Sequence, residues 1–256
     1  MHRTSLIATL AGVAAAATVT AAATASVTTF DNEQTNGWGV FHSNDGTLGD
    51  FLLPDGGNPG ANLQFRMVDT WGASLNNSTN SDVLGDYGRF GGGVHLSVDV
   101  KVNSIVYDPW FDGGNEVERH LVVELVDYNP PGSDYPYVSV YYDLGTISSW
   151  ATGNWTTFGI TIADPFSAAL PTGWGGTGAE DPNTFEPKLP DGRTFASVLA
   201  SVDEIRFTTL VPGYFYGFTY FDTQYDNVTV QGVPGPGAVA AGILGGALLR
   251  GRRRRA

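Results

Sequence analysis

The sequence of 256 residues contains no cysteine. This absence excludes disulfides, thiol nucleophiles and cysteine-based metal sites, so the folded part must be held together by its own core. Histidine is also scarce, with four residues, and none of them forms a His-Glu-x-x-His or close His-x-His zinc motif. A Gly-x-Ser-x-Gly nucleophile elbow is missing as well. The common metal-hydrolase and serine-hydrolase motifs are therefore not present.

Basic residues are few and unevenly placed. The chain has 13 Lys and Arg against 26 Asp and Glu, for a net charge of -13. Five of the arginines lie in the last seven residues, whereas all 26 acids lie between residues 31 and 226. Residues 26–232 therefore hold seven basic and 26 acidic residues, a net charge of −19. A stretch this acidic repels phosphate backbones, so a nucleic-acid partner is excluded for it.

The N-terminus has the three regions of a secretory signal peptide. A basic start with Arg3 precedes a weakly apolar stretch over residues 6–23, and small residues occupy Ala23 and Ala25. This pattern predicts that residues 1–25 are removed by signal peptidase after Ala25. The alternative, a buried or membrane-spanning helix, is less favoured because the stretch is rich in Ala and Thr rather than Leu and Ile.

The C-terminal segment 233–256 combines two prolines, an apolar run and a basic end. Pro234 and Pro236 precede the apolar residues 238–249. Counted as a helix from residue 233, this run is about 26 Å long against a hydrocarbon core of about 30 Å. The arginines favour a cytoplasmic position for the end that follows. The basic end consists of Arg250, Arg252, Arg253, Arg254 and Arg255.

This tail resembles the bacterial PEP-CTERM sorting signal, which has a Val-Pro-Glu-Pro box, a short helix and an arginine cluster. The resemblance implies an exosortase-like membrane protease that releases the protein at the cell surface after transient anchoring in the membrane. Gly235 stands where the box has glutamate. Two alternatives follow from this departure: a variant processing enzyme reads the tail, or the tail is a retained anchor.

Residues 26–232 have the pattern of one all-β domain. Apolar and polar residues alternate without interruption over 94–102, which predicts a strand with one solvated face. Similar runs occupy 62–69, 119–128, 137–144, 155–162, 204–211 and 225–231, separated by Gly, Pro, Asn and Asp. One short helix is expected at 195–202, capped by Asp191 or Thr194. The predicted fold is an antiparallel β-sandwich or jelly roll.

The order of several short motifs resembles the laminin B (laminin IV type A) domain. Asn-Pro-Gly at 58–60 and Leu-Gly-Asp at 84–86 precede the long strand, and a Trp-initiated strand, a helix running into Ile-Arg, and Asp-Asn-Val follow it. The resemblance implies a galactose-binding-like jelly roll that serves as a structural or recognition module without catalytic activity. Gly88-Arg89-Phe90 is an insertion, and Tyr225 replaces the usual Leu.

Calcium is the metal that this composition favours, because Asp, Asn and Gly are abundant. Many galactose-binding-like sandwiches carry a structural calcium that joins the first and last strands. By this analogy Asp31 or Glu33 would lie beside Asp226. A second possibility is the loop 108–116, which could present several oxygens to one cation. The alternative is that the acids only solubilise the surface.

Aromatic residues are the remaining candidates for ligand binding, because flat rings stack on sugars as readily as they fill cores. Five lie in or beside Gly- and Pro-rich loops: Trp71, Trp110, Tyr135, Tyr137 and Trp174. Together with the two terminal signals, they predict an exported, non-catalytic module of the cell surface or extracellular matrix whose partner is a polysaccharide.

Two other functions stay open at this point. A polysaccharide-degrading enzyme would need a carboxylate pair, for which Glu116, Glu118 and Glu124 are the candidates. A purely structural surface protein would need no ligand at all.

Overall fold

The computed structural model describes residues 25–41, 50–69, 71–107, 114–128, 135–148, 150, 153–214 and 217–234. The predictions for the signal peptide up to residue 24, for the tail from residue 235 and for Trp110 lie outside the described residues. In the part of the chain that is described, no helix is long and apolar enough to cross a membrane.

The strand predicted from strict alternation forms the centre of the first sheet. It is β6 (Gly93–Tyr107), and it pairs antiparallel with β15 (Thr219–Val233) over nearly its whole length. This seven-stranded sheet has the order β10-β6-β15-β4-β3, with β1 beside β15 and β7 beside β6. Its other strands are β1 (Ala25–Thr28), β3 (Asp50–Gly57), β4 (Gly60–Asp69), β7 (Asn115–Glu116) and β10 (Thr156–Ile162).

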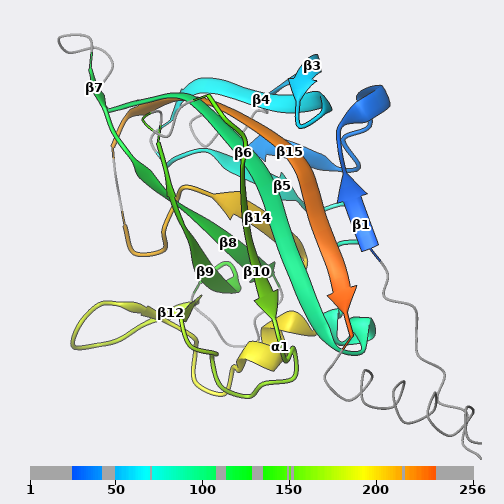
Figure 1. The fold of residues 1–256 in the computed structure, drawn as a ribbon. Coiled ribbons are helices and arrows are strands. Elements are labelled where there is room, and N and C mark those ends of the chain that lie inside the picture. Colours follow the sequence, from blue (N-terminus) through cyan, green and yellow to red (C-terminus); the bar gives the residue numbers. More distant parts are fainter. Residues whose placement is uncertain are drawn as a thin grey trace, which may run out of the picture.

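The second sheet has six strands in the order β11-β9-β8-β14-β5-β2, all antiparallel (Figure 1). They are β2 (Trp38–Phe41), β5 (Ser74–Asn77), β8 (Arg119–Asp127), β9 (Val138–Ile147), β11 (Trp174–Thr177) and β14 (Glu204–Thr208). A hairpin of β12 (Ala179–Glu180) and β13 (Pro187–Lys188) and two 3-10 helices, η1 (Asp31–Glu33) and η2 (Tyr87–Phe90), complete the elements beside one α-helix.

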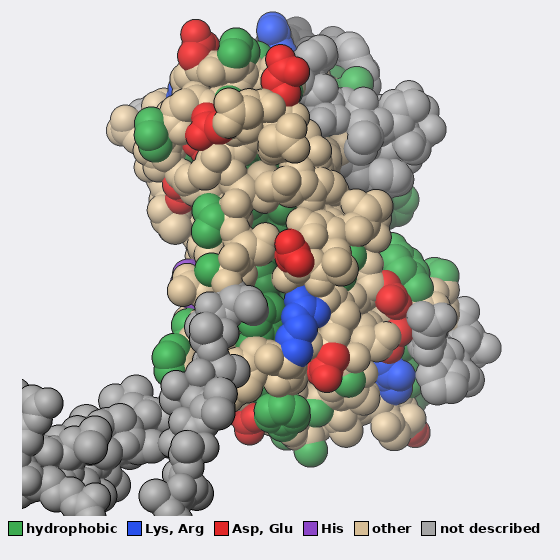
Figure 2. Space-filling model, turned by 90° about the vertical axis from the view of Figure 1, so that its right-hand side faces the viewer, with side chains coloured by type: hydrophobic (Ala, Val, Ile, Leu, Met, Phe, Trp, Pro, Cys, Tyr) green, Lys and Arg blue, Asp and Glu red, His purple; other side chains and the backbone are tan. Residues whose placement is uncertain are grey.

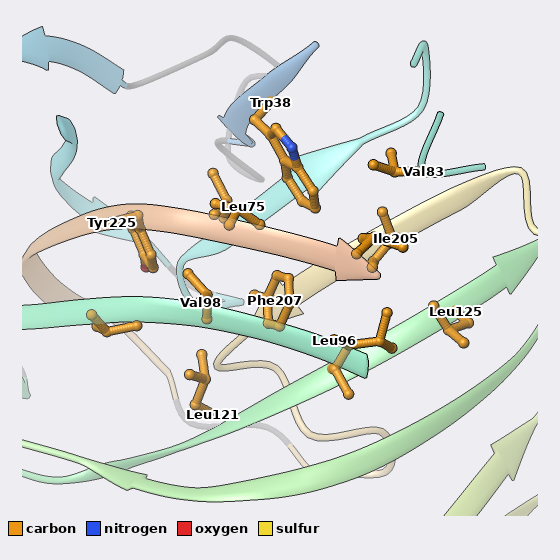
Figure 3. Close-up of a cluster of buried hydrophobic side chains, with 14 of the residues drawn as sticks. Trp38, Leu75, Val83, Leu96, Val98, Leu121, Leu125, Ile205, Phe207 and Tyr225 are labelled. Carbon is orange, nitrogen blue, oxygen red and sulfur yellow. The ribbon is translucent and has the colours of Figure 1, made fainter. Parts of the chain in front are cut away.

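The core lies between the two sheets. Leu96, Val98 and Tyr225 from the first sheet meet Leu121 and Phe207 from the second (Figure 3). Among the described residues, the buried apolar side chains of this core lie between residues 30 and 230. The predicted fold class, an antiparallel β-sandwich of jelly-roll type with one short helix, is confirmed.

The helix is shorter than the sequence predicts. It is α1 (Phe195–Leu199), and Thr194 rather than Asp191 caps it through a capping box with Ser197. Val202 does not continue the helix, because it forms a β-bridge with Gly85. A long-range backbone pairing therefore replaces the last helical turn.

The first and last described strands are neighbours. Ala25 of β1 lies opposite Gln231 of β15, and the pairing continues to Thr28 opposite Val228. Both ends of the described chain therefore leave the sandwich along the same pair of strands (Figure 1).

Candidate ligand-binding groove

A long groove lies on the outer face of the six-stranded sheet. It consists of two adjoining cavities of about 670 and 440 Å³, which share Trp71, Glu124 and Leu210. The lining runs from Gly39 on β2 at one edge of the sheet to Thr177 on β11 at the other. Five strand spacings give a length of about 24 Å. We refer to this feature as the groove.

Strand alternation places the polar side chains of the groove. On β14, Ile205 and Phe207 point into the core, so Glu204, Arg206 and Thr208 point outward. On β8 the neighbours of Glu124 in sequence are likewise core residues. The register of the two strands puts Arg206 directly opposite Glu124.

These strands form an ion-paired floor, which we call the Arg206 network. The Arg206 guanidinium donates to Glu124 Oε2 at 3.1 Å, to Glu204 Oε2 at 3.0 Å and to Tyr128 Oη at 2.7 Å. Tyr128 in turn donates to Glu204, and Ser139 donates to the other oxygen of Glu124 at 2.5 Å. The guanidinium also lies over the ring of Tyr137, 5.1 Å from its centroid. Each member of the floor is therefore held by at least one other.

Burial and charge pairing shift two pKa values in this network. Burial, together with the hydrogen bond to Glu204, raises the pKa of Tyr128 to about 12. For Arg206, burial lowers the pKa, but the hydrogen bond to Glu204 and the charges of Glu124 and Glu204 outweigh it, and the pKa is raised. The guanidinium therefore stays charged and the phenol stays protonated throughout the physiological range.

Aromatic side chains form the walls. Trp71 is 48% exposed, and Tyr135 and Tyr137 line the groove on the other side of Glu124. The structure thus brings together three of the five aromatic residues predicted to bind a ligand. Three further wall residues were not predicted: Tyr128, Phe185 and Tyr214.

The three residues that were not predicted have different sequence signals. Tyr128 is the last residue of the strand predicted at 119–128, so the pattern does not single it out. Its ring packs edge-on against Tyr137, with 6.0 Å between the ring centroids. Phe185 is 75% exposed and lies in the turn between β12 and β13, and Tyr214 is 68% exposed and lies in the loop after β14. A Pro- and Gly-rich context, the same signal that identified Trp71, was available for both.

Trp174, predicted to bind a ligand, does not line the groove. Its side chain is 9% exposed and packs in the core against Phe195, with ring centroids 5.0 Å apart, and against Tyr142. It begins β11, which pairs with β9, so the ring points away from the groove. The glycines that follow it belong to β11, an edge strand of the sheet, and not to a surface loop.

The three glutamates proposed for catalysis do not come together. Glu116 lies on β7 beside β6, where it accepts a hydrogen bond from Ser104. Glu118 and Glu124 are six positions apart, which is about 20 Å in an extended strand, against the roughly 5–10 Å that glycosidases use. In the groove, the carboxylates that approach one another are Glu124 and Glu204, which share Arg206. Both accept hydrogen bonds from its guanidinium.

The residues predicted to bind calcium lie in a different place, where the first and last strands meet. Asp226 is fully buried and accepts hydrogen bonds from the backbone N–H of Asn58 and of Asn227. Asp31 accepts from the backbone N–H of Ala61 at 3.0 Å, and Glu33 is exposed. Burial raises the pKa of Asp226, and the charges of Asp99 and Asp31 raise it further against those backbone hydrogen bonds.

Asp31 and Asp226 lie close enough for their charges to interact, and each accepts hydrogen bonds. Across the described ranges, no group of three or more His, Asp or Glu side chains is arranged to hold a metal ion. Both oxygens of Asp226 accept hydrogen bonds from backbone N–H groups, and Asp31 accepts from the Ala61 N–H and the Thr29 hydroxyl. Calcium binding stays a prediction.

No family model matches the sequence, and no curated protein matches it. Solved structures with a similar fold include a family 22 carbohydrate-binding module with the catalytic module of a Clostridium thermocellum xylanase, complexed with xylohexaose, at a TM-score of 0.42 and 15% identity. That match covers 81% of this chain and 28% of the other, so this chain spans little more than a quarter of it.

Two further structures are matched over most of their own length. A family 11 carbohydrate-binding module from Clostridium thermocellum, in complex with a β-1,3-1,4-mixed-linked tetrasaccharide, has a TM-score of 0.43 and 14% identity over 82% of this chain and 97% of the other. A family 22 xylan-binding domain from Paenibacillus barcinonensis has a TM-score of 0.40 and 11% identity over 81% and 98%.

Proposed function

We propose that the protein is a non-catalytic module that binds a polysaccharide in the groove. The observation that carries this proposal is the combination of exposed aromatic walls with a fixed polar floor. Sugar rings have apolar faces that stack on Trp and Tyr, and hydroxyl groups at their edges that donate to carboxylates. Trp71 and Tyr214 supply rings for the first contact, and Glu204 supplies an acceptor for the second.

The groove is preformed, which favours binding. Arg206 is held by two carboxylates, a phenol and a ring, so the floor does not have to be ordered when a ligand arrives. Its length of about 24 Å accommodates several consecutive sugar rings of a linear chain. A site of this shape suits a polymer better than a single sugar.

We also propose an exported location, from the sequence of the two termini. Residues 1–25 would be a signal peptide, and residues 233–256 a variant PEP-CTERM-type tail that anchors the laminin-B-like body in the membrane until an exosortase-like protease cuts it. The mature body would then belong to the cell surface or the extracellular matrix. The mass of the protein recovered from cells tests this proposal, and a mature mass that includes the tail would contradict processing.

Retention on immobilised polysaccharides tests the binding proposal. The sandwich segment 26–232 would be run in affinity electrophoresis through xylan, mixed-linked β-glucan and agarose. Wild-type protein should be retarded by at least one of them, and Trp71→Ala should weaken the retardation strongly. Trp150→Ala is the matched control, because Trp150 is 62% exposed and does not line the groove.

Two outcomes would contradict the proposal. If Trp71→Ala is retarded as strongly as the wild type, then the groove is not the site. If no polysaccharide retards the wild type while sizing chromatography shows self-association, a purely structural surface protein is the better description.

A further inference from the structure

The groove contains acidic groups and a single basic one. Among the described residues that line it, Glu124 and Glu204 lie on the floor and Glu180 on the rim, whereas Arg206 is the only Lys, Arg or His. Both Nη atoms of Arg206 donate to Glu124, Glu204 or Tyr128, and its Nε is buried. An arginine is the usual partner of a sugar carboxylate, because its planar fork binds the two oxygens together. Here both Nη atoms of the Arg206 guanidinium are already hydrogen-bonded within the protein.

The basic side chains around the groove do not make up for the lack of an available arginine. Lys188 lies 3.9 Å from Asp191, and Arg193 forms a largely buried ion pair with Asp127. Basic side chains are few in the sequence as a whole, and on the one face of the molecule seen in Figure 2 they are sparse with acidic ones nearby. Residues 26–232 carry a net charge of −19. The field around the groove is therefore negative, and it opposes the approach of an anionic chain.

We propose that the groove selects glycans by charge: it excludes polymers that carry carboxylate or sulfate groups and accepts uncharged or amino-bearing chains. This inference rests on the proposed polysaccharide-binding function. A ligand carboxylate placed in the groove would lie near Glu204 or Glu180 with no basic side chain left to pair with it. Like charges at short range in a partly desolvated site disfavour binding, and this repulsion is a means of rejecting wrong partners.

The same carboxylates favour uncharged chains. A neutral sugar hydroxyl can donate to a carboxylate oxygen, and a hydrogen bond to a charged acceptor is stronger than one between neutral groups. An ammonium group on an amino sugar would gain the same contact together with attraction to the aromatic walls. The floor is thus suited to hydroxyl and amino donors and unsuited to anions.

Matched polymers of one backbone test the inference. Retardation would be compared on hydroxyethylcellulose and carboxymethylcellulose, and on neutral arabinoxylan and glucuronoxylan, at low salt. We expect binding to the anionic member to be weaker by about tenfold or more, the ratio that ~1.4 kcal/mol of repulsion gives. The difference should shrink as NaCl is raised above 0.1 M, where charges are screened beyond about 10 Å.

A rim variant provides a second readout. Glu180→Lys should raise the ratio of retardation on the anionic polymers to retardation on the neutral ones. Asp82→Lys, which makes the same charge change at an exposed residue outside the groove, should have a much smaller effect. Equal or stronger retention on the anionic members would overturn the charge selection and leave polysaccharide binding intact. Failure of every polymer to retain the protein would instead overturn the proposed function and this inference together.

Discussion

The Arg206 network makes a quantitative prediction about stability. In Arg206→Met the guanidinium is lost, and two carboxylates whose side chains are only 5% and 8% exposed are left side by side. Removing one partner of a buried ion pair typically costs about 3–5 kcal/mol, because the remaining charge stays buried without compensation. Here one guanidinium serves two charges. We therefore expect the free energy of unfolding to fall by at least ~3 kcal/mol.

Chemical and thermal unfolding of the 26–232 segment would measure this loss. The midpoint of thermal unfolding should fall by on the order of 10 °C for a domain of this size. The triple variant Arg206→Met, Glu124→Gln, Glu204→Gln removes the uncompensated charges and should recover much of the loss. A decrease below ~1 kcal/mol in Arg206→Met, the value of an exposed pair, would refute the reasoning. So would a triple variant no more stable than the single one.

Three further predictions follow from individual side chains. Trp174→Ala should lower the free energy of unfolding by about 3–5 kcal/mol, as expected for a core aromatic, whereas Tyr214→Ala should change it by less than ~0.5 kcal/mol but weaken polysaccharide retention. The pKa of Tyr128 is raised to about 12, so its contribution to stability should be complete below pH 10 and disappear as the pH rises through 12; Tyr128→Phe should lack this loss in thermal unfolding. Calcium, if it binds, should raise the thermal midpoint of the wild type but not of Asp226→Asn, and a flat calorimetric titration would end the calcium prediction.

The fold class could be predicted because its signals are local. Alternation over 94–102 recurs as β6, and each of the other predicted runs overlaps a strand. The error in α1 has a non-local cause, since Val202 satisfies its backbone by pairing with Gly85, more than a hundred residues earlier. Apolar spacing carries no information about such a partner. A helix end set by a distant strand therefore lies beyond what periodicity can show.

Some of the aromatic walls of the groove could be predicted from the sequence, whereas its ion-paired floor could not. Trp71, Tyr135 and Tyr137 could be identified because aromatic residues in turn-rich segments are a local pattern. The pairing of Glu124 with Arg206 depends on the register between β8 and β14, across 82 residues of chain. Trp174 was misjudged for the complementary reason, since its glycine neighbours are the same in a loop and in an edge strand. Only pairing with β9 decides between the two.

The loops and the strands of the groove should contribute different properties. The aromatic walls from the loops should set the affinity, and the charged side chains on the strands should set the selectivity. The walls come largely from connecting segments and present ring faces, which every glycan can meet, so their removal should weaken all ligands by similar factors. Glu204 and Arg206 lie on β14, and Glu180 lies on β12, which positions their charges whether or not a ligand is present. Changes at Glu180 or Glu204 should therefore alter the ratio of neutral to anionic binding, while Trp71→Ala should leave that ratio unchanged in whatever binding survives. An effect of the wall variant on the ratio would mean that the rings, and not the carboxylates, distinguish the ligands.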